Sequence, residues 1–365
     1  MSKRRLLSAI FIVLTLCLSC AVLYLSARSG SQGSDIRNLT AGSRNLLSGN
    51  PPSAKNLSLY PAFNYLLYFY LGLIPQKVLV PLTQCAALLL ILLSLKAWGG
   101  KESTLRNPGI LLILSVPVLQ LLYIDQLNTA VAFASMTVAL HGINRRWWWL
   151  AGAGALISLV CRPLNAIVIL PGLFFLVPRK GYLLSLLYGA ILGIILTVAT
   201  WMWDRNFLHA LLHSSHTRPL VGPIGYFREA FGLHGLVVYV LAVAVCAVLI
   251  GYSTRQLDIW DSAAILFAFS LLTVHLGGQY VALYEIPAVY RLAYRWNRKW
   301  ILGAYIGGYG ICNIIYGTLG AHFAVLGPVS IPWIMMPLIA GLLVLIVLVR
   351  AAEHSSRTPT PGALP

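Results

Sequence analysis

Asp35 is the one carboxylate in a polar stretch, from Ser29 to Phe63, that lies between two strongly apolar segments. A carboxylate can take up a proton from a hydroxyl group, so an isolated Asp in such a loop is a candidate for acid–base chemistry. Asp is also a preferred N-cap, and a short helix beginning at Ile36 would give Asp35 a purely structural role. Both interpretations stay open on these residues alone.

Polar residues that could bind a substrate also interrupt the apolar segments further along the chain. Arg162 stands in "VCRPLN", and a charged residue inside an apolar segment of a membrane protein indicates function by default. Alternatively, the proline after it makes a helix-breaking turn from which Arg162 extends to the lipid head groups. Asp125 stands in "YIDQLN", where it either takes part in chemistry or caps a helix that begins at Gln126.

The composition assigns the chain to the class of membrane proteins. Of its 365 residues, 59% are hydrophobic and only 10% are charged, and the mean hydropathy is +0.80. A soluble domain has about a quarter of its residues charged. The six cysteines all lie in apolar segments, so no disulfide framework is indicated.

Apolar runs of the length of a membrane span recur along the whole chain. A helix needs about 20 apolar residues to cross a bilayer, and fewer where it is broken or partly buried in protein. About twelve spans are predicted, at residues 6–26, 77–97, 108–124, 126–143, 147–161, 163–177, 182–203, 235–252, 259–276, 279–293, 300–318 and 331–350. The first is interpreted as an uncleaved helix, because its apolar run is long for a signal peptide. The fold class is therefore an all-α polytopic membrane protein, and the two shortest spans leave open a count lower by one pair.

The distribution of basic residues predicts which ends of these helices face the cytoplasm. With the amino terminus inside, alternate loops carry most of the Lys and Arg residues, which is the pattern of loops that stay in the cytoplasm. Both termini are then cytoplasmic, and the long loops at 27–76 and 204–234 face outward. The net charge of +17 follows from this orientation and from contact with anionic lipid head groups, so no nucleic-acid partner is indicated.

Other parts of the chain are assigned by composition. Residues 62–74 are aromatic-rich and too short to span, which predicts a helix lying at the membrane interface. Residues 1–350 are expected to form a single transmembrane domain, followed by a disordered cytoplasmic tail at 351–365. The stretch "HALLHSSH" has histidines at helical spacing, but no carboxylate completes a metal site there. Contact with an acceptor or with lipid head groups is the favoured interpretation.

Three stretches resemble a family of integral-membrane glycosyltransferases. The first stretch begins at Asp35 and continues with "IRNLTAGSRNLLSGNPP" and "YPAFNYLLYFYLGLIP". It is similar to the family layout D-x-x-x-(x)-x-x-A-x-x-L-L-x-G-x-P … Y-P-P. Later family motifs are similar to the other two stretches, "DQLNTAVAFASMTVALHGINRRWWWLAGAGALISLVCRPLN" and "HLGGQYVALYEIPAVYRL". The chain thus resembles the GT-C superfamily, and within it the polyprenol-phosphate-mannose-dependent α-(1→2)-mannosyltransferases (glycosyltransferase family 87). It differs from the family pattern at Asp125, where Gly is usual, at Arg162, where Lys is usual, and at Ala62, where a second Pro is usual.

The resemblance implies transfer of a hexose or pentose, with mannose favoured, from a polyprenyl-phosphate donor to a hydroxyl of a lipid-linked or cell-envelope glycan. It implies an inverting reaction at the outer face of the plasma membrane, with one Asp as general base. The implied residues are Asp35 as the base, Asp125 as rival base or sugar ligand, Arg162 and His275 at the donor phosphate, and Gln126, Asn128, Tyr60, Tyr280 and His322 at the sugar or acceptor.

The same resemblance bears on cofactors and partners. Branches of the superfamily that use a divalent cation often carry a D-x-D or E-x-D pair in the first outer loop, and this chain has none there. A metal-independent enzyme without a cofactor is therefore expected. The expected partners are membrane lipids, the lipid-linked sugar donor and the glycan acceptor, and the sequence indicates no oligomeric state.

A transporter or flippase for a lipid-linked or anionic substrate is the alternative function. Twelve spans with both termini inside is also a transporter layout, and Arg162 would then lie in the substrate path. Secondary transporters tend to have internal repeats with broken helices at corresponding positions. Only the first half of this chain begins with a long polar loop, and the halves show no convincing similarity, so the enzyme is the favoured interpretation.

Overall fold

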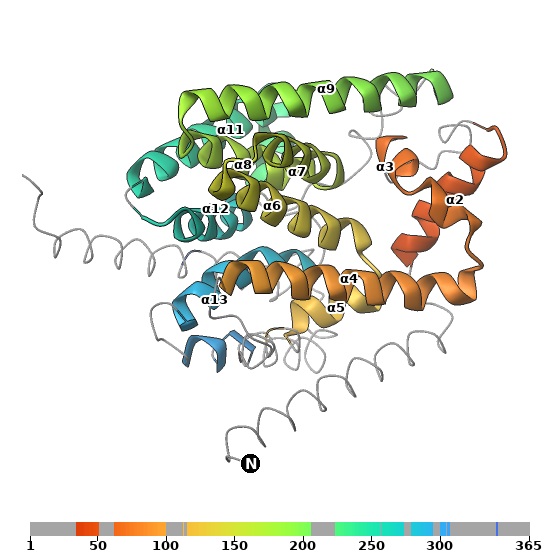
Figure 1. Cartoon of the computed structure of the whole chain (residues 1–365), viewed down its shortest axis with the longest axis horizontal. Coiled ribbons are helices and arrows are strands. Elements are labelled where there is room, and N and C mark those ends of the chain that lie inside the picture. The colour runs from red at the N-terminus through yellow and green to blue at the C-terminus, as the bar shows by residue number, and fades with distance from the viewer. Residues whose placement is uncertain are drawn as a thin grey trace, which may run out of the picture. The chain divides into compact units, whose positions relative to one another are not determined.

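In a computed structural model of the chain, the described part consists of helices joined by short turns (Figure 1). The structure describes residues 34–50, 62–99, 112, 115–205, 223–255, 257–273, 279–294, 300–303, 305–306 and 341. The elements are α2 (Ser34–Leu47), α3 (Ala62–Leu67), η2 (Phe69–Leu73), α4 (Gln76–Gly99), α5 (Val116–Ile124), α6 (Leu127–Arg145), α7 (Trp148–Cys161), α8 (Pro163–Phe175), α9 (Arg179–Trp203), α11 (Pro223–Thr254), α12 (Ile259–Thr273), η5 (Gln279–Glu285) and α13 (Ile286–Tyr294). The predicted all-α class is confirmed for these residues.

Three of the described helices are long and apolar enough to cross a membrane. They are α4, α9 and residues Ala230–Thr254 of α11, and each coincides with a predicted span. α7, α12 and residues Asn165–Phe174 of α8 are apolar but shorter. These helices identify a membrane protein. The count of about twelve spans stays a prediction, because several of them, such as 6–26, lie outside the described residues.

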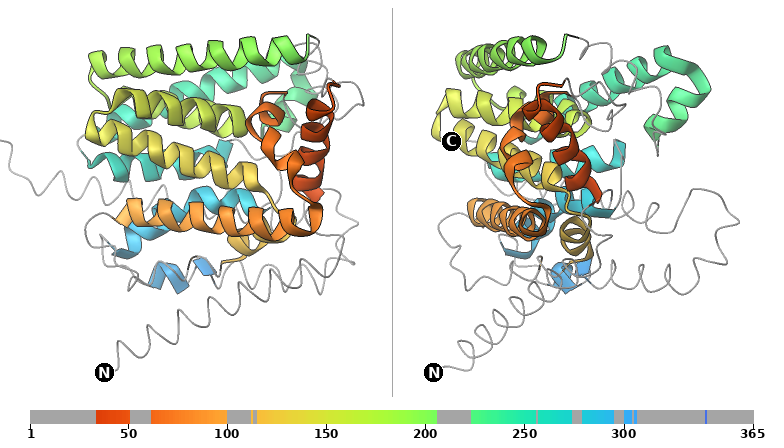
Figure 2. Two further views of the ribbon diagram at one scale, coloured as in Figure 1. Left: turned by 45° about the vertical axis from the view of Figure 1, so that its right-hand side comes forward. Right: turned by 90° about the vertical axis from the view of Figure 1, so that its right-hand side faces the viewer.

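The first of two compact units comprises residues 1–166 and 180–219. In it α6 packs against α7 and α4, while α2 packs against α3 and η2. Figure 2 shows α4, α6 and α7 running alongside one another, with α2 and α3 across one end of the group. Small residues allow the close approach of α6 and α7: a Cβ on Gly154 would lie within 3 Å of the Ser135 carbonyl oxygen.

Turn-forming residues set the ends of α6 and α7. α6 ends at Arg145, and the C-cap Arg146 adopts the left-handed conformation (φ 60°, ψ 29°), so the chain reverses before α7. α7 ends at Cys161, because Arg162 precedes Pro163 and a residue before proline avoids the helical conformation. The predicted ends of both helices lie within two residues of the observed ones.

The polar first loop contains a 14-residue amphipathic helix, α2. It begins at Ser34, two residues before the helix start considered from the sequence. The side chains on its buried face recur at helical spacing and are Ile36, Leu39, Thr40, Ser43 and Leu46. Residues 62–74, predicted as one interfacial helix, form α3 and η2, which are separated at Tyr68 (φ −111°, ψ 18°). Arg44 Nε donates to the Gly72 carbonyl oxygen at 3.4 Å and so joins α2 to η2.

The second unit comprises residues 167–179 and 220–365. In it α12 packs against α11, η5 and α13, and residues 263–268 of α12 are fully buried. The span predicted at 279–293 is instead η5 followed by α13, because Pro287 has no amide proton to continue a preceding helix. Gly232 (φ 63°, ψ −153°) breaks α11, whose first part begins inside the predicted outer loop. The single domain predicted for residues 1–350 stays a prediction.

Candidate functional site

Polar side chains from α4, α6 and the ends of α5 and α7 gather inside the first unit. We name them the polar cluster: Thr83, Gln84, Asp125, Gln126, Asn128, Thr129 and Arg162. Arg162 is half-buried and the other six are buried. Buried polar groups within membrane-embedded protein are costly unless they are paired, and they commonly mark a substrate site. The sequence predicted four of these residues as site residues: Asp125, Gln126, Asn128 and Arg162.

Arg162 is held against the first turn of α6. It follows α7 in a non-helical conformation (φ −144°, ψ 72°), and its amide donates to the Ser158 carbonyl oxygen at 2.8 Å. Its Nε and Nη2 donate to Thr129 Oγ1 at 3.0 and 2.5 Å, and Nη2 also donates to Gln126 Oε1 at 3.4 Å. The break imposed by Pro163 therefore turns the guanidinium toward α6, where a planar cation could also bind an anion.

Asp125 lies at the junction of α5 and α6. It is the C-cap of α5 in the left-handed conformation (φ 56°, ψ 55°), which Asp tolerates better than most residues, and it is 1% exposed. Thr83 Oγ1 lies 2.6 Å from Asp125 Oδ2 and 2.8 Å from the Leu79 carbonyl oxygen, and its single proton can be donated to either. α6 begins at Leu127 with Gln126 as its N-cap residue, so Asp125 does not cap α6 from the position considered in the sequence.

Two amide side chains complete the polar cluster. Gln84 Nε2 donates to the Leu122 carbonyl oxygen at 2.7 Å, which ties α4 to α5. Asn128 is 4% exposed, and among the described residues neither its amide nitrogen nor its amide oxygen has a hydrogen-bond partner. A buried carboxamide whose hydrogen bonds are not met by the described residues can bind a polar group of a ligand.

The remaining predicted site residues are described in part or not at all. Asp35 is in the first turn of α2, which packs against α5, but its side chain is outside the described part of the structure. Tyr280 is in η5, and its side chain is likewise not described. Tyr60, His275 and His322 lie outside the described residues. Their roles, and the choice between Asp35 and Asp125 as base, stay predictions.

A contact between η2 and α7 places a further segment beside Arg162. Tyr68 precedes η2, and its hydroxyl oxygen lies 3.5 Å from the sulfur of Cys161, the residue before Arg162. α3 also packs against α7. The α3–η2 segment, predicted only as an interfacial helix, therefore lies against the end of α7 that carries the cluster.

The sequence analysis did not identify Thr83, Thr129 or Asn64 as site residues. Thr83 and Thr129 hydrogen-bond to Asp125 and Arg162, and Asn64 is fully buried in α3. The available signal was a polar residue inside an apolar run, as in "LVPLTQCAALLL" around Thr83. That signal is weak, because a Thr in a helix can satisfy its hydroxyl on its own backbone.

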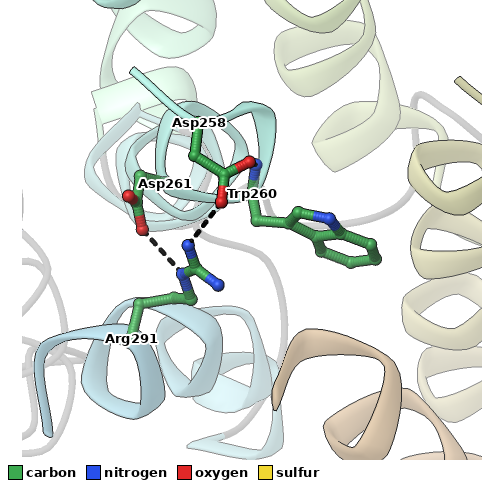
Figure 3. A network of polar contacts seen from close by, with 4 residues as sticks. All are labelled: Asp258, Trp260, Asp261 and Arg291. Atoms are coloured by element: carbon green, nitrogen blue, oxygen red, sulfur yellow. Dashed lines mark hydrogen bonds and ion pairs between the residues drawn. The ribbon is translucent and has the colours of Figure 1, made fainter. Parts of the chain in front are cut away.

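The second unit contains a separate ionic network, which joins the start of α12 to α13 (Figure 3). Arg291 Nε lies 2.6 Å from Asp261 Oδ1, and its Nη2 lies 2.9 Å from Asp258 Oδ2. The Trp260 amide donates to Asp258 Oδ1 at 3.3 Å. Both carboxylates therefore offset the charge of Arg291 within the second unit.

Metal-binding groups are not found together within the described residues. No three His, Cys, Asp or Glu side chains lie close enough there to hold a metal ion. The "HALLHSSH" stretch lies outside the described residues. Glu285, at the junction of η5 and α13, is a fully buried carboxylate that the sequence analysis did not identify as a candidate.

In the first unit Lys96, Arg145 and Lys180 lie at the helix ends opposite the polar cluster, while Lys77 lies at the cluster end of α4. Thr83 is near the start of α4 and Lys96 is in its last turn. Gln126 precedes α6, which ends at Arg145. Lys180 is in the first turn of α9, next to Gly181, and a Cβ on Gly181 would collide with the ring of Trp148, the first residue of α7. This separation of charge fits the predicted orientation, with basic ends inside.

Comparison of the chain with protein-family models, with curated proteins and with solved structures finds no match.

Proposed function

We propose that this membrane protein is a glycosyltransferase that moves a sugar, with mannose favoured, from a polyprenyl-phosphate donor to a hydroxyl of a lipid-linked or cell-envelope glycan. One observation supports it most. Asp125, Gln126, Asn128 and Arg162 come from the two ends of one stretch that resembles the GT-C pattern and meet in one cluster, with Arg162 and Gln126 hydrogen-bonded across 36 residues of chain. A carboxylate, two amides and a guanidinium are the groups that base catalysis, sugar binding and phosphate binding require.

The proposed reaction is an inverting displacement. The acceptor hydroxyl oxygen bonds to the anomeric carbon while the bond from that carbon to the phosphate oxygen breaks. The hydroxyl proton passes to an Asp carboxylate, and the polyprenyl phosphate leaves with the electron pair. A phosphate leaving group needs no general acid of the kind that a glycosidase supplies, so one carboxylate suffices. Asp35 is the favoured base and Asp125 the rival.

Arg162 is proposed to bind the donor phosphate, together with His275. A guanidinium offers several N–H donors in one plane and can engage two phosphate oxygens at once. Gln126, Asn128, Tyr60, Tyr280 and His322 are proposed to contact the sugar or the acceptor. The reaction is proposed to occur at the outer face of the plasma membrane, with both termini cytoplasmic and without a metal or cofactor.

The test is transfer of radiolabelled sugar from a panel of polyprenyl-phosphate sugars, in membranes that contain the wild type, Asp35→Asn or Asp125→Asn. Removing the general base is expected to lower the rate about a hundredfold or more. The variant with that loss, at normal protein level, identifies the base. Glu353→Gln, in the predicted tail, is the matched control and should keep the wild-type rate.

Two outcomes would count against the proposal. If a chelator abolishes transfer, the metal-independent mechanism is wrong. If a folded wild type transfers sugar from no donor, the enzyme is wrong, and movement of a labelled lipid-linked sugar across vesicle membranes would then support the transporter.

A further inference from the structure

Asn64, in α3, is a buried amide whose hydrogen bonds are not made inside the described protein. Its exposed fraction is 0%, and neither Nδ2 nor Oδ1 has a hydrogen-bond partner among the described residues. An unpaired carboxamide in a protein interior lowers stability, so native proteins keep few of them and those few call for an explanation. Asn64 is outside every role assigned from the sequence.

The position of Asn64 connects it to the polar cluster. The Tyr68 amide donates to the Asn64 carbonyl oxygen at 3.0 Å, so the two residues lie one helical turn apart. The Tyr68 hydroxyl contacts Cys161, which precedes Arg162, and α3 itself packs against α7. Asn64 therefore lies on the segment that adjoins the Arg162 end of α7.

Asn128, in the first turn of α6, repeats this property. It too is buried with both amide atoms unpaired among the described residues, and it precedes Thr129, which accepts two hydrogen bonds from Arg162. Two amides with unmet hydrogen bonds thus stand on the two segments, α3 and α6, that approach the end of α7. A carboxamide offers donors and an acceptor without charge, which matches a hydroxyl group, itself a donor and an acceptor.

We propose that Asn64 binds a hydroxyl group of the transferred sugar and so takes part in choosing that sugar. This inference rests on the proposed function and adds a specificity residue to it. A phosphate would favour a cation such as Arg162, and an apolar prenyl chain would leave the amide unpaired. A sugar hydroxyl satisfies the Asn64 amide without introducing charge.

The test compares wild type, Asn64→Leu and Asn64→Ala in the sugar-transfer assay, with a set of polyprenyl-phosphate sugar donors that each lack one hydroxyl. Leu is close to Asn in size, and replacing an unpaired buried amide by an apolar group is neutral or stabilising. We expect an unchanged or higher midpoint of thermal unfolding for Asn64→Leu. We also expect a fall of about tenfold in kcat/KM with the full donor, the loss expected for one hydrogen bond.

The donor series identifies the hydroxyl. For one deoxy donor, kcat/KM of both Asn64 variants should equal that of the wild type, because wild type and variant then lack the same hydrogen bond. Asn50→Leu, an identical change at an exposed residue after α2, should leave transfer unchanged.

Four results would overturn the inference. Wild-type kinetics in both Asn64 variants would exclude a role in binding while leaving the proposed function intact. The same holds for an equal penalty with every deoxy donor, or for a lower unfolding midpoint in Asn64→Leu, since either would indicate a structural amide. Absence of transfer by the folded wild type from every donor would instead remove the proposed function, and this inference with it.

Discussion

The Thr129 hydroxyl is one of the groups that orient Arg162. Thr129 Oγ1 accepts from both Nε and Nη2 of Arg162 and lies 3.4 Å from Gln126 Oε1, to which it can donate its own proton. These hydrogen bonds hold the plane of the guanidinium group in one orientation, and the Arg162 side chain stays half-buried. A cation held in one orientation binds a phosphate with less loss of side-chain entropy than a mobile one. Thr129 is therefore a positioning residue for the proposed phosphate ligand.

Thr129→Val tests this role at the residue scale. Valine keeps the shape but removes the acceptor, and hydrogen bonds to charged groups contribute about 1.5–3 kcal/mol. We expect KM for the lipid-linked donor to rise about tenfold or more, with a smaller change in kcat, measured by initial rates of transfer.

Thr137→Val is the matched control for Thr129→Val. Thr137 is buried in the same helix, and its hydroxyl accepts from Trp98 Nε1 at 3.1 Å, away from Arg162. It should lower the unfolding midpoint without changing KM for the donor. Equal effects of the two variants on KM would show that Thr129 acts only through stability.

At the scale of elements, glycines decide how closely the helices of the first unit approach. A Cβ on Gly152 of α7 would lie within 3 Å of the Ser185 carbonyl oxygen and the Gly189 amide nitrogen of α9. Backbone atoms cannot rotate away as the end of a side chain can. Contact between α7 and α9 therefore requires a residue without a side chain at this position.

Gly152→Ala is expected to separate α7 from α9 and to destabilise the protein by about 1–3 kcal/mol, the cost of overpacking. The measurement is the midpoint of thermal unfolding in detergent. Gly193→Ala, in α9, is the control, because a Cβ there meets only Leu156 Cδ1 at 3.5 Å, an ordinary contact. The α7–α9 contact would be ruled out if both variants unfolded at the wild-type temperature.

The ionic network of the second unit also acts between elements. Arg291 of α13 is held by Asp258 and Asp261 at the start of α12, and Asp261 is 3% exposed. Removing the cation takes the oppositely charged partner from a buried carboxylate, and breaking a buried ion pair costs about 3–5 kcal/mol. Arg291→Met should therefore lower the unfolding midpoint strongly, and adding Asp261→Asn should recover part of the loss.

Arg255→Met controls for Arg291→Met, because Arg255 is exposed and stacks on the Tyr252 ring with its Cζ 4.3 Å from the ring centroid. Its loss should change the midpoint little, since exposed charges contribute little to stability. A small effect of Arg291→Met, similar to that of Arg255→Met, would mean that the network does not fasten α12 to α13.

Helix ends were predictable from the sequence where a chemical boundary coincides with them. Arg145 and Pro163 end α6 and α7 where charge or a missing amide proton requires it, and the apolar runs of α4 and α9 are long enough to be unambiguous. The division of residues 279–293 into η5 and α13 was not predicted, because hydropathy does not distinguish a 3₁₀ turn from an α-helical one. The break of α11 at Gly232 was not predicted either, because hydropathy carries no information on backbone conformation.

Residues of the candidate site were predictable from the sequence only at or near a charged side chain that lies in an apolar segment. Arg162 and Asp125 are charged residues in apolar segments, so both were identified. Thr83 and Thr137 both lie within hydrogen-bond distance of a backbone carbonyl oxygen four residues earlier, at 2.8 and 3.0 Å. The sequence cannot show that Thr83 also reaches a carboxylate. Asn64 lies in the sequence just after a polar loop, where an exposed Asn is common. Its burial depends on the packing of α3 against α7, which the sequence does not show.

At the scale of the whole molecule, the orientation in the membrane decides which solvent the polar cluster meets. In the first unit Lys96 of α4, Arg145 of α6 and Lys180 of α9 lie at the helix ends opposite the polar cluster, while Lys77 lies at the other end of α4. Short basic loops remain in the cytoplasm during insertion. The cluster should therefore face outward, where a lipid-linked donor in the outer leaflet can reach it.

Two single cysteines test this orientation. Asn50→Cys lies just after α2 and Asn144→Cys lies at the end of α6; both positions are exposed, and neither change removes a charge. A membrane-impermeant maleimide should label Asn50→Cys on intact cells and Asn144→Cys only after permeabilisation. The unsubstituted chain gives the background, which should be low because all six cysteines lie in apolar segments, out of reach of a reagent confined to water. Labelling of Asn144→Cys on intact cells would reverse the orientation and place the polar cluster on the cytoplasmic side. A donor presented in the outer leaflet could then not be the substrate.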